Sequence, residues 1–259
     1  MAQARDHIGR LSRELGEVFK VSEAAAILNV SPQEASKSLS RWAKQGWITR
    51  IRYGLYAVVG IDAASKDQPL DNMWVLIPEV FSPGYVGGWS AAEYWDFTEQ
   101  IFTDICAFTE KRLMHKKHEI LGITYSLTHI PHSLNFGTEV VWIKNKKAYV
   151  SDPHKTIVDM LYTPAVGGGI QHTIDCFKEY IKSKHYNPVQ LVDYAKRMNN
   201  GAVFKRLGYL SEKILGDRDN LASICLAKLT KGPSYIDPSL KKGKFITRWS
   251  LYVPLTLQI

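Results

Sequence analysis

The chain has 259 residues and a formal net charge of +8, and its 45% hydrophobic and 22% charged residues are ordinary for a folded globular protein. This composition excludes wholesale disorder, and the length suits a small domain followed by a larger one. No apolar run approaches the roughly 20 residues of a membrane span, and the charged N-terminus lacks the apolar core of a signal peptide. The three cysteines are far apart and lack CxxC spacing, so we expect a cytoplasmic protein without disulfides.

Positive charge is concentrated near the N-terminus. Residues 1–60 hold nine Lys and Arg against five acidic residues, and the stretch 36–52 holds five basic residues and no acidic one. Such a stretch favours a polyanionic partner. Residues 61–72 are small and polar, include a proline and lack apolar periodicity, which indicates a linker between a domain at 1–60 and one at 73–259.

The first residues have the pattern of two consecutive helices. Apolar side chains recur three to four positions apart over 2–15, which is typical of an amphipathic helix. A short helix is expected over 22–29, with Ser22 as its N-cap. Its expected buried face consists of Ala25, Ala26 and Leu28.

The sharpest local signal belongs to the next helix. Ser31 is a favourable N-cap, Pro32 takes the first helical position, and Glu34 stands three residues after the cap. This combination is a capping box with an N-terminal proline, and it predicts a helix that runs to Gln45 and stops at Gly46. Three helices of this spacing predict a helix–turn–helix.

A hairpin is expected directly after these helices. Residues 47–58 alternate apolar and basic side chains about Gly54. In a winged helix–turn–helix this hairpin would be the wing, and Arg50, Arg52 and Tyr53 would reach the phosphate backbone or the minor groove.

The third helix has one apolar and one hydrogen-bonding face. Ala35, Leu39 and Trp42 would point inward. The opposite face has no acidic residue, and its side chains can read base edges or hold phosphates in a major groove. It consists of Gln33, Ser36, Lys37, Ser40, Arg41 and Lys44. The alternative is the solvated polar face that any amphipathic helix carries.

The second domain is predicted to be α+β, with strands first and a helical bundle after them. Runs rich in β-branched and aromatic residues predict strands at 73–80, 101–109, 118–130 and 138–150. The last run is expected to be a hairpin that turns at Asn145–Lys146. A short helix is expected over 91–95 with Ser90 as its cap. Later helices are expected over 153–162, 170–183, 188–199, 202–215 and 219–229, and a final strand over 244–255.

The second domain holds no convincing active site. The histidine pairs at 115/118 and 129/132 lack a recognised set of metal ligands, and we assign neither a metal nor a cofactor. Gly167–Gly169 could seat a phosphate at a helix N-terminus but reads more simply as a loop. No paired carboxylates or nucleophile motif suit a transferase, nuclease or hydrolase, so no catalytic residue is assigned.

Two further basic clusters occur in this domain. The first, a possible second nucleic-acid surface, consists of Lys196, Arg197, Lys205, Arg206 and Lys213. The other consists of Lys241, Lys242, Lys244 and Arg248. A solvated cationic face on a helical bundle is the alternative for both.

The order of these segments resembles the AbiEi family of antitoxins from bacterial type IV toxin–antitoxin (abortive infection) systems. The resemblance is carried by the winged helix and by four later segments. These are YVGGWSAAEYWDFTEQ at 85–100, IFTDICAFTEKR at 101–112, VSDPHKTIVDML at 150–161 and GGGI at 167–170.

The resemblance implies a protein of two functions. The N-terminal domain would bind inverted repeats of double-stranded DNA in its own promoter and repress the operon. The C-terminal domain would counter a nucleotidyltransferase-like toxin without a stable complex. The residues themselves leave two alternatives open, namely an enzyme acting on nucleic acid that the winged helix delivers, and a transcription factor outside any toxin system.

Overall fold

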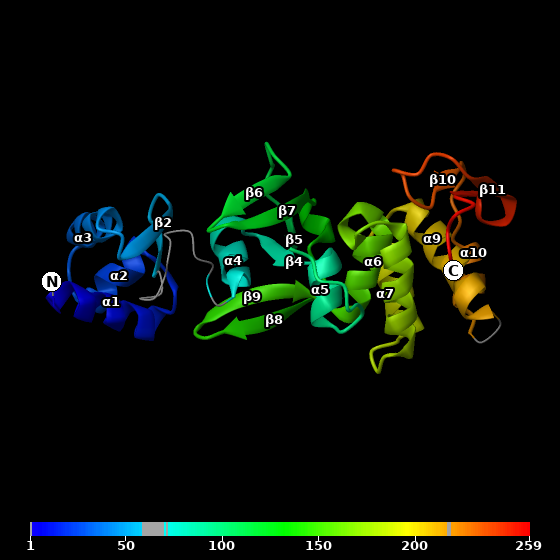
Figure 1. Cartoon of the computed structure of the whole chain (residues 1–259). Coiled ribbons are helices and arrows are strands. Elements are labelled where there is room, and N and C mark those ends of the chain that lie inside the picture. The colour runs from blue at the N-terminus through cyan, green and yellow to red at the C-terminus, as the bar shows by residue number, and fades with distance from the viewer. Residues whose placement is uncertain (1, 59–69, 71, 217–218) are drawn as a thin grey trace.

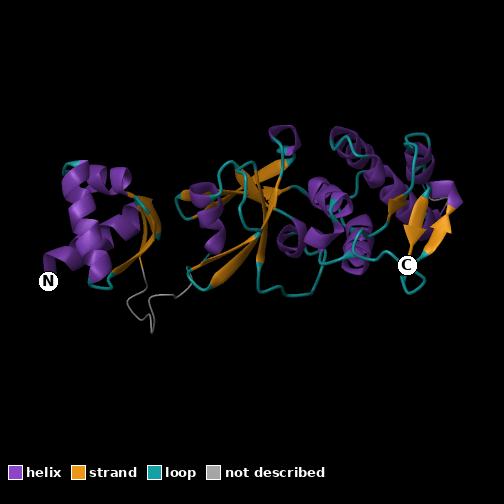
Figure 2. Cartoon of the chain, turned by 90° about the horizontal axis from the view of Figure 1, so that it is seen from above, coloured by secondary structure: helices purple, strands orange, loops and turns teal. Residues whose placement is uncertain are grey.

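The computed structural model describes residues 2–58, 70, 72–216 and 219–259, and it has the predicted α+β fold. The described part is elongated, with the N-terminal helices at one end, a mixed sheet in the middle, and helices with a small sheet at the other end (Figures 1 and 2). Most of the linker expected at 61–72 lies outside the described residues, so the domain boundaries stay a prediction. No described helix has both the length and the apolar character that a membrane crossing needs.

The N-terminal part is a winged helix–turn–helix. Its helices are α1 (Ala2–Leu15), α2 (Val21–Leu28) and α3 (Pro32–Lys44). Its strands are β1 (Val18–Lys20), β2 (Ile48–Arg52) and β3 (Leu55–Val58). The strands form an antiparallel sheet in the order β1-β3-β2, so the predicted hairpin gains a strand from the α1–α2 connection.

Helix α2 differs in detail from the prediction. Its N-cap is Lys20, whose backbone N–H donates to a Glu23 carboxylate oxygen at 2.7 Å, so Ser22 is not the cap. Its buried residues are Ala24 and Ala25, whereas Ala26 is exposed. The helix starts earlier because the backbone of Lys20 leaves β1 in an extended conformation and turns directly into the helix.

Helix α3 confirms its predicted start. Ser31 Oγ accepts a hydrogen bond from the Glu34 backbone N–H at 3.3 Å, while Ser31 N–H donates to the Glu34 carboxylate at 3.0 Å. Pro32 stands at the first helical position, and the helix ends before Gly46, whose φ of +79° favours glycine. The inward side chains Ala35, Leu39 and Trp42 are buried as expected.

The Ser31→Ala variant is expected to lose about 1 kcal/mol of unfolding free energy, because it removes the oxygen that accepts the Glu34 N–H. Urea denaturation of the full chain measures this loss. Ser38→Ala, on the same helix but away from the cap, is the control and should change stability far less. An equal loss in both variants would contradict the role assigned to the cap.

The middle of the molecule is a six-stranded mixed sheet in the order β6-β7-β5-β4-β9-β8. Its strands are β4 (Gly84–Val86), β5 (Ile105–Thr109), β6 (Lys117–Ile120), β7 (Ile123–His129), β8 (Thr138–Ile143) and β9 (Lys146–Ser151). The pairs β4–β9 and β5–β7 are parallel, and the other three pairs are antiparallel.

The central strands β4 and β5 contribute side chains to two cores, because successive strand residues point to opposite faces of the sheet. Tyr85, Cys106 and Phe108 join the apolar core under the helices that follow the sheet. Val86 and Ala107 belong to a second core on the other side. Helix α5 (Gly88–Tyr94) joins β4 to β5, and the one-turn helix η2 (His132–Leu134) joins β7 to β8.

The second core reaches into the winged helix. Val18, Leu55 and Ala57 of the small N-terminal sheet share one buried cluster with Met73 and Leu76. These last two lie in η1 (Met73–Val75) and α4 (Leu76–Val80). The winged helix therefore packs on the central sheet domain through the face of its own sheet.

A helical part and a small sheet complete the chain. The helices are α6 (Pro153–Tyr162), η3 (Pro164–Gly167), α7 (Ile170–Lys182), α8 (Pro188–Arg197), α9 (Gly201–Ile214) and α10 (Leu221–Leu226). The last strands are β10 (Ser234–Tyr235), β11 (Lys244–Ile246) and β12 (Leu251–Val253), with η5 (Thr247–Trp249) before β12. Helix α6 begins at Pro153 as predicted, and Asp152 is its N-cap.

Three local predictions for residues 73–259 are wrong. The apolar run 73–80 forms η1 and α4 rather than a strand, because short apolar runs do not distinguish a buried strand from a buried helix. Ser90 lies inside α5 and accepts a hydrogen bond from Cys106 N–H at 3.0 Å instead of capping the helix. The segment 244–255 forms two antiparallel strands around η5.

Candidate nucleic-acid interface

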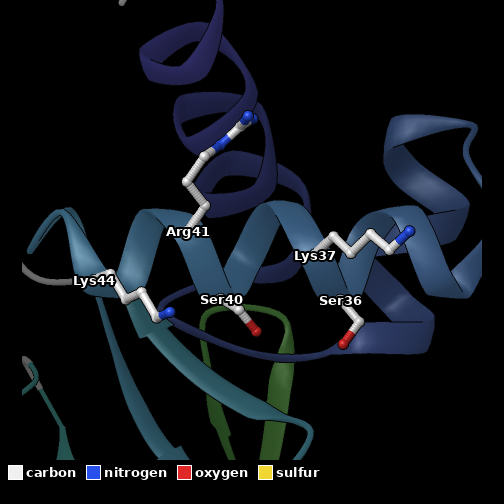
Figure 3. Close-up of a pocket in the computed structure, with 5 residues that line it drawn as sticks. All are labelled: Ser36, Lys37, Ser40, Arg41 and Lys44. Carbon is white, nitrogen blue, oxygen red and sulfur yellow. The ribbon is translucent and has the colours of Figure 1, made fainter.

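The outer face of α3 is open and basic. Ser36, Lys37, Ser40, Arg41 and Lys44 line one open hollow along the helix. Figure 3 shows that the three long cationic side chains spread from α3 in different directions, and that Ser36 and Ser40 project from the lower side of the helix in this view. Gln33 is exposed one turn before this group, so the face continues to the start of the helix.

The spacing of these cations is costly for an isolated helix. Lys37 and Arg41 are four residues apart, and Arg41 and Lys44 are three apart, so like charges are neighbours on the helix surface. Glu34, one turn before Lys37, is the only acidic residue of α3. An anionic partner along this face would relieve the repulsion, which is what a DNA phosphate backbone provides.

The helix is held in place from beneath. Leu39 and Trp42 are buried in a core shared with Phe19 and Ile48. Ser40 Oγ lies 3.3 Å from the Tyr56 hydroxyl of β3, so this serine also ties α3 to the sheet. The exposed side chains are therefore displayed from a rigid support.

The wing places its three predicted residues differently. Tyr53 at the tip is 88% exposed, and the Arg50 guanidinium lies over its ring at 5.2 Å. Arg52 instead donates a hydrogen bond to the Glu79 backbone carbonyl near the C-terminal end of α4. Arg50 and Tyr53 are thus free to face a ligand, whereas Arg52 also fastens the wing to the central domain.

Two acidic residues of the winged helix, Glu17 and Glu23, pair with lysines of the central domain. The Lys144 ammonium pairs with Glu17, and Lys146 Nζ donates to Glu23 at 2.7 Å. Burial alone would raise the pKa of the Glu23 carboxyl, but hydrogen bonds from Lys146 and from the Lys20 backbone outweigh it and lower that pKa. These pairs take negative charge away from the α3 side.

Sequence reasoning did not predict that the β8–β9 hairpin contacts the winged helix. The turn between β8 and β9 carries Lys144 and Asn145, and the Asn145 amide donates to the Glu14 carbonyl. The hairpin itself was predicted, although its turn falls one residue earlier than expected. Its two lysines around an asparagine were a visible signal of a basic tip, but their acidic partners are more than 100 residues away in sequence.

The predicted second basic surface is wrong for two of its members. Lys205 and Arg206 are 1% and 4% exposed, and their charged groups donate to backbone carbonyls. Lys205 donates to Gly232, and Arg206 donates to Leu161 at 2.6 Å and to Tyr235 at 2.8 Å. Both side chains are therefore structural, because they are buried and their charged groups are paired with carbonyls of the chain. The exposed members are Lys196, Arg197 and Lys213.

His132 and the backbone directly after the glycine run make contacts within the protein. Among the described residues, no group of three or more His, Cys, Asp or Glu side chains could hold a metal ion. His132 lies 3.1 Å from the Glu110 carboxylate. At the N-terminus of α7, directly after Gly169, Ile170 N–H donates to Asp237 at 3.1 Å. A carboxylate of the chain therefore occupies the place considered for a phosphate.

The three cysteines are free thiols in the core. Burial raises the pKa of the Cys176 thiol and of the Cys225 thiol to about 12 each. Burial likewise raises the pKa of the Cys106 thiol. Thiols of this kind are protonated and unreactive near neutral pH.

The fold and its open basic helix define a winged helix–turn–helix protein. Residues 10–59 match the model of a family described as "Transcriptional regulator, AbiEi antitoxin". The N-terminal part of the chain is therefore similar to the AbiEi antitoxin family of transcriptional regulators, which agrees with the resemblance at that end.

The chain as a whole resembles a solved structure. The crystal structure of the RV2827C protein from Mycobacterium tuberculosis matches with a TM-score of 0.68 at 15% identity, over 97% of this chain and 91% of that one. At this identity the likeness shows the fold alone. No curated protein matches the chain.

Proposed function

We propose that the protein is the antitoxin of a type IV toxin–antitoxin system and represses its own operon. The α3 face carries this proposal, because its adjacent cations are exposed and lack acidic neighbours beyond Glu34. Gln33, Ser36, Lys37, Ser40 and Arg41 read base edges in the major groove of double-stranded DNA. Lys44, Arg50, Arg52 and Tyr53 contact phosphates or the minor groove.

The operator is an inverted repeat in this proposal, since two copies of one winged helix bind two half-sites of opposite orientation. A reporter fused to the promoter of the chain's own operon tests repression. Wild-type protein should lower expression, and Arg41→Ala should restore it. Equal repression by both proteins would contradict the assignment of α3.

Arg41→Ala is expected to weaken operator binding by about 1–3 kcal/mol and to relax sequence preference, because a bidentate contact to a base edge is lost. Fluorescence anisotropy with a labelled operator and a set of single-base variants measures both effects. A uniform loss across all sequences would instead assign Arg41 to phosphate.

Lys44→Ala is expected to reduce the slope of log K against log salt by about one unit, with little change in sequence preference, because one phosphate contact disappears. The measurement is a salt titration of operator binding. A changed base preference with an unchanged slope would contradict a phosphate contact.

The remaining domain is proposed to counter a nucleotidyltransferase-like toxin in the cytoplasm without a stable complex and without catalysis of its own. The antitoxin description of the matching family supports this part. Co-expression with the neighbouring gene's product tests it, using Arg41→Ala/Lys44→Ala so that repression is removed. Growth rescue by this variant supports a separate antitoxin function, and loss of rescue with loss of repression would overturn it.

A further inference from the structure

The small C-terminal sheet carries a row of aromatic side chains across its three strands. Tyr235 of β10 and Phe245 of β11 both pair directly with Tyr252 of β12, so the three residues share one face. The rings of Tyr235 and Tyr252 are stacked at 5.0 Å between centroids, and those of Phe245 and Tyr252 lie 4.9 Å apart. Tyr235 is 37% exposed and Phe245 is 39% exposed. Two of three neighbouring rings are therefore open to solvent.

The ends of this row have free stacking capacity. Among the described residues, Tyr235 and Phe245 each have a ring partner on one side only, namely Tyr252. A planar ring of a ligand could continue the row at either end. Every nucleobase, whichever of the four it is, has such a planar face.

Positive charge precedes the row along the chain. Lys241 and Lys242 lie just before β11 and are exposed. Lys244, which begins β11, is also exposed but lies on the face opposite Phe245, because successive strand residues alternate in direction. The side chains of Lys241 and Lys242 make no hydrogen bond or ion pair with any residue in the described ranges, and residues 238–259 contain no acidic residue. Asp237, the last acid of the sequence, is buried and occupied by Ile170 N–H and Ser239.

The sheet is anchored well enough to present the row. The Arg206 guanidinium donates to the Tyr235 carbonyl at 2.8 Å and 3.0 Å. Trp249, between β11 and β12, is fully buried, and its indole N–H donates to Glu212 at 3.1 Å. The aromatic and cationic side chains thus project from a fixed support.

We propose that this surface, named here the aromatic–lysine surface (Tyr235, Tyr252, Phe245, Lys241 and Lys242), binds single-stranded nucleic acid. Lysines neutralise the phosphates while unpaired bases stack on Tyr235 and Phe245. A duplex suits it less, because its bases are already stacked on one another inside the helix. The surface lies at the opposite end of the molecule from α3 (Figures 1 and 2) and acts independently of operator binding.

The test uses the full chain with labelled uridine-rich single-stranded RNA, the matching single-stranded DNA, and a duplex of the same length, followed by fluorescence anisotropy. Tyr235→Leu/Phe245→Leu keeps apolar volume but removes stacking, and it should weaken single-strand binding about tenfold or more. Trp142→Leu is the control, since Trp142 is 62% exposed on β8 beside Lys147.

The charge arm compares Lys241→Ala/Lys242→Ala with Lys182→Ala/Lys184→Ala, which removes the same charge from exposed sites on and after α7. Only the first should flatten the salt dependence of single-strand binding. Arg41→Ala should leave single-strand binding unchanged, which separates this surface from the operator site. Circular dichroism melts check that each variant is folded, and Phe245→Tyr, which retains a ring, should bind normally.

Three results would overturn the proposal. These are no single-strand binding in the micromolar range, equal losses in the Trp142 and Tyr235/Phe245 variants, or tighter binding of poly-glutamate than of single-stranded RNA. The last result would make the surface a site for an acidic protein.

Discussion

The Lys155→Met variant is expected to lose about 3–5 kcal/mol of unfolding free energy, because it leaves a buried carboxylate without its cation. Lys155 and Asp159 are almost completely buried on α6 and form an ion pair. Lys155 Nζ also donates to the Tyr85 hydroxyl at 2.9 Å, and that hydroxyl donates to Asp159 at 3.0 Å. The three groups satisfy one another in the core beneath the central sheet.

The loss should shrink at acid pH. Burial raises the pKa of the Asp159 carboxyl even in the wild type, where the Lys155 ammonium opposes this shift. Without the lysine, the folded chain holds a proton that the unfolded chain releases, so stability falls as pH rises above the ordinary pKa near 4.

Urea denaturation at pH 5 and pH 8 measures both effects. The control is Lys155→Met/Asp159→Leu, which removes both charges and should recover much of the stability. A loss under 1 kcal/mol in the single variant, or a larger loss at pH 5 than at pH 8, would contradict the account.

Arg206→Met is expected to lose about 3 kcal/mol or more, because several backbone carbonyls lose a charged donor at once. Its guanidinium donates to Leu161 and Tyr162 at the end of α6 and to Tyr235 of β10. Burial lowers the pKa of Arg206 to about 10, so the group remains charged near neutral pH. This one side chain joins the helical part to the C-terminal sheet.

Arg206→Lys separates charge from geometry, since an ammonium cannot reproduce the fork of the guanidinium. We expect it to be nearly as unstable as Arg206→Met. Lys196→Met, at an exposed position of α8, is the control for lost charge. Full recovery by Arg206→Lys would show that charge alone matters at this site.

Local signals in the sequence predicted helix α3 well. Ser31, Pro32 and Glu34 act within one turn, so their effect does not depend on the rest of the fold. Strand β1 escaped prediction because three residues carry no periodicity and are defined by pairing with β3. That pairing joins residues more than 30 positions apart.

The fate of individual cations depends on contacts that the sequence does not show. In the sequence, Lys205 and Arg206 resemble part of a basic surface. In the structure they are buried and donate hydrogen bonds to carbonyls of distant segments. Arg52 similarly meets Glu79 across the boundary between the winged helix and the central domain. Counting charges therefore located the α3 face, because helix periodicity determines which side chains share that face. It failed where contacts with residues distant in sequence determine whether a cation is exposed.

We propose above all that the outer face of α3 recognises an operator. The most direct test is the affinity of the full chain for duplex DNA carrying the inverted repeats of its own promoter, compared with a scrambled duplex at fixed salt. Arg41→Ala/Lys44→Ala should weaken operator binding about 100-fold and bring it close to the scrambled value, whereas Lys182→Ala/Lys184→Ala should bind the operator like the wild type. Unchanged operator affinity in the Arg41/Lys44 variant would contradict the claim.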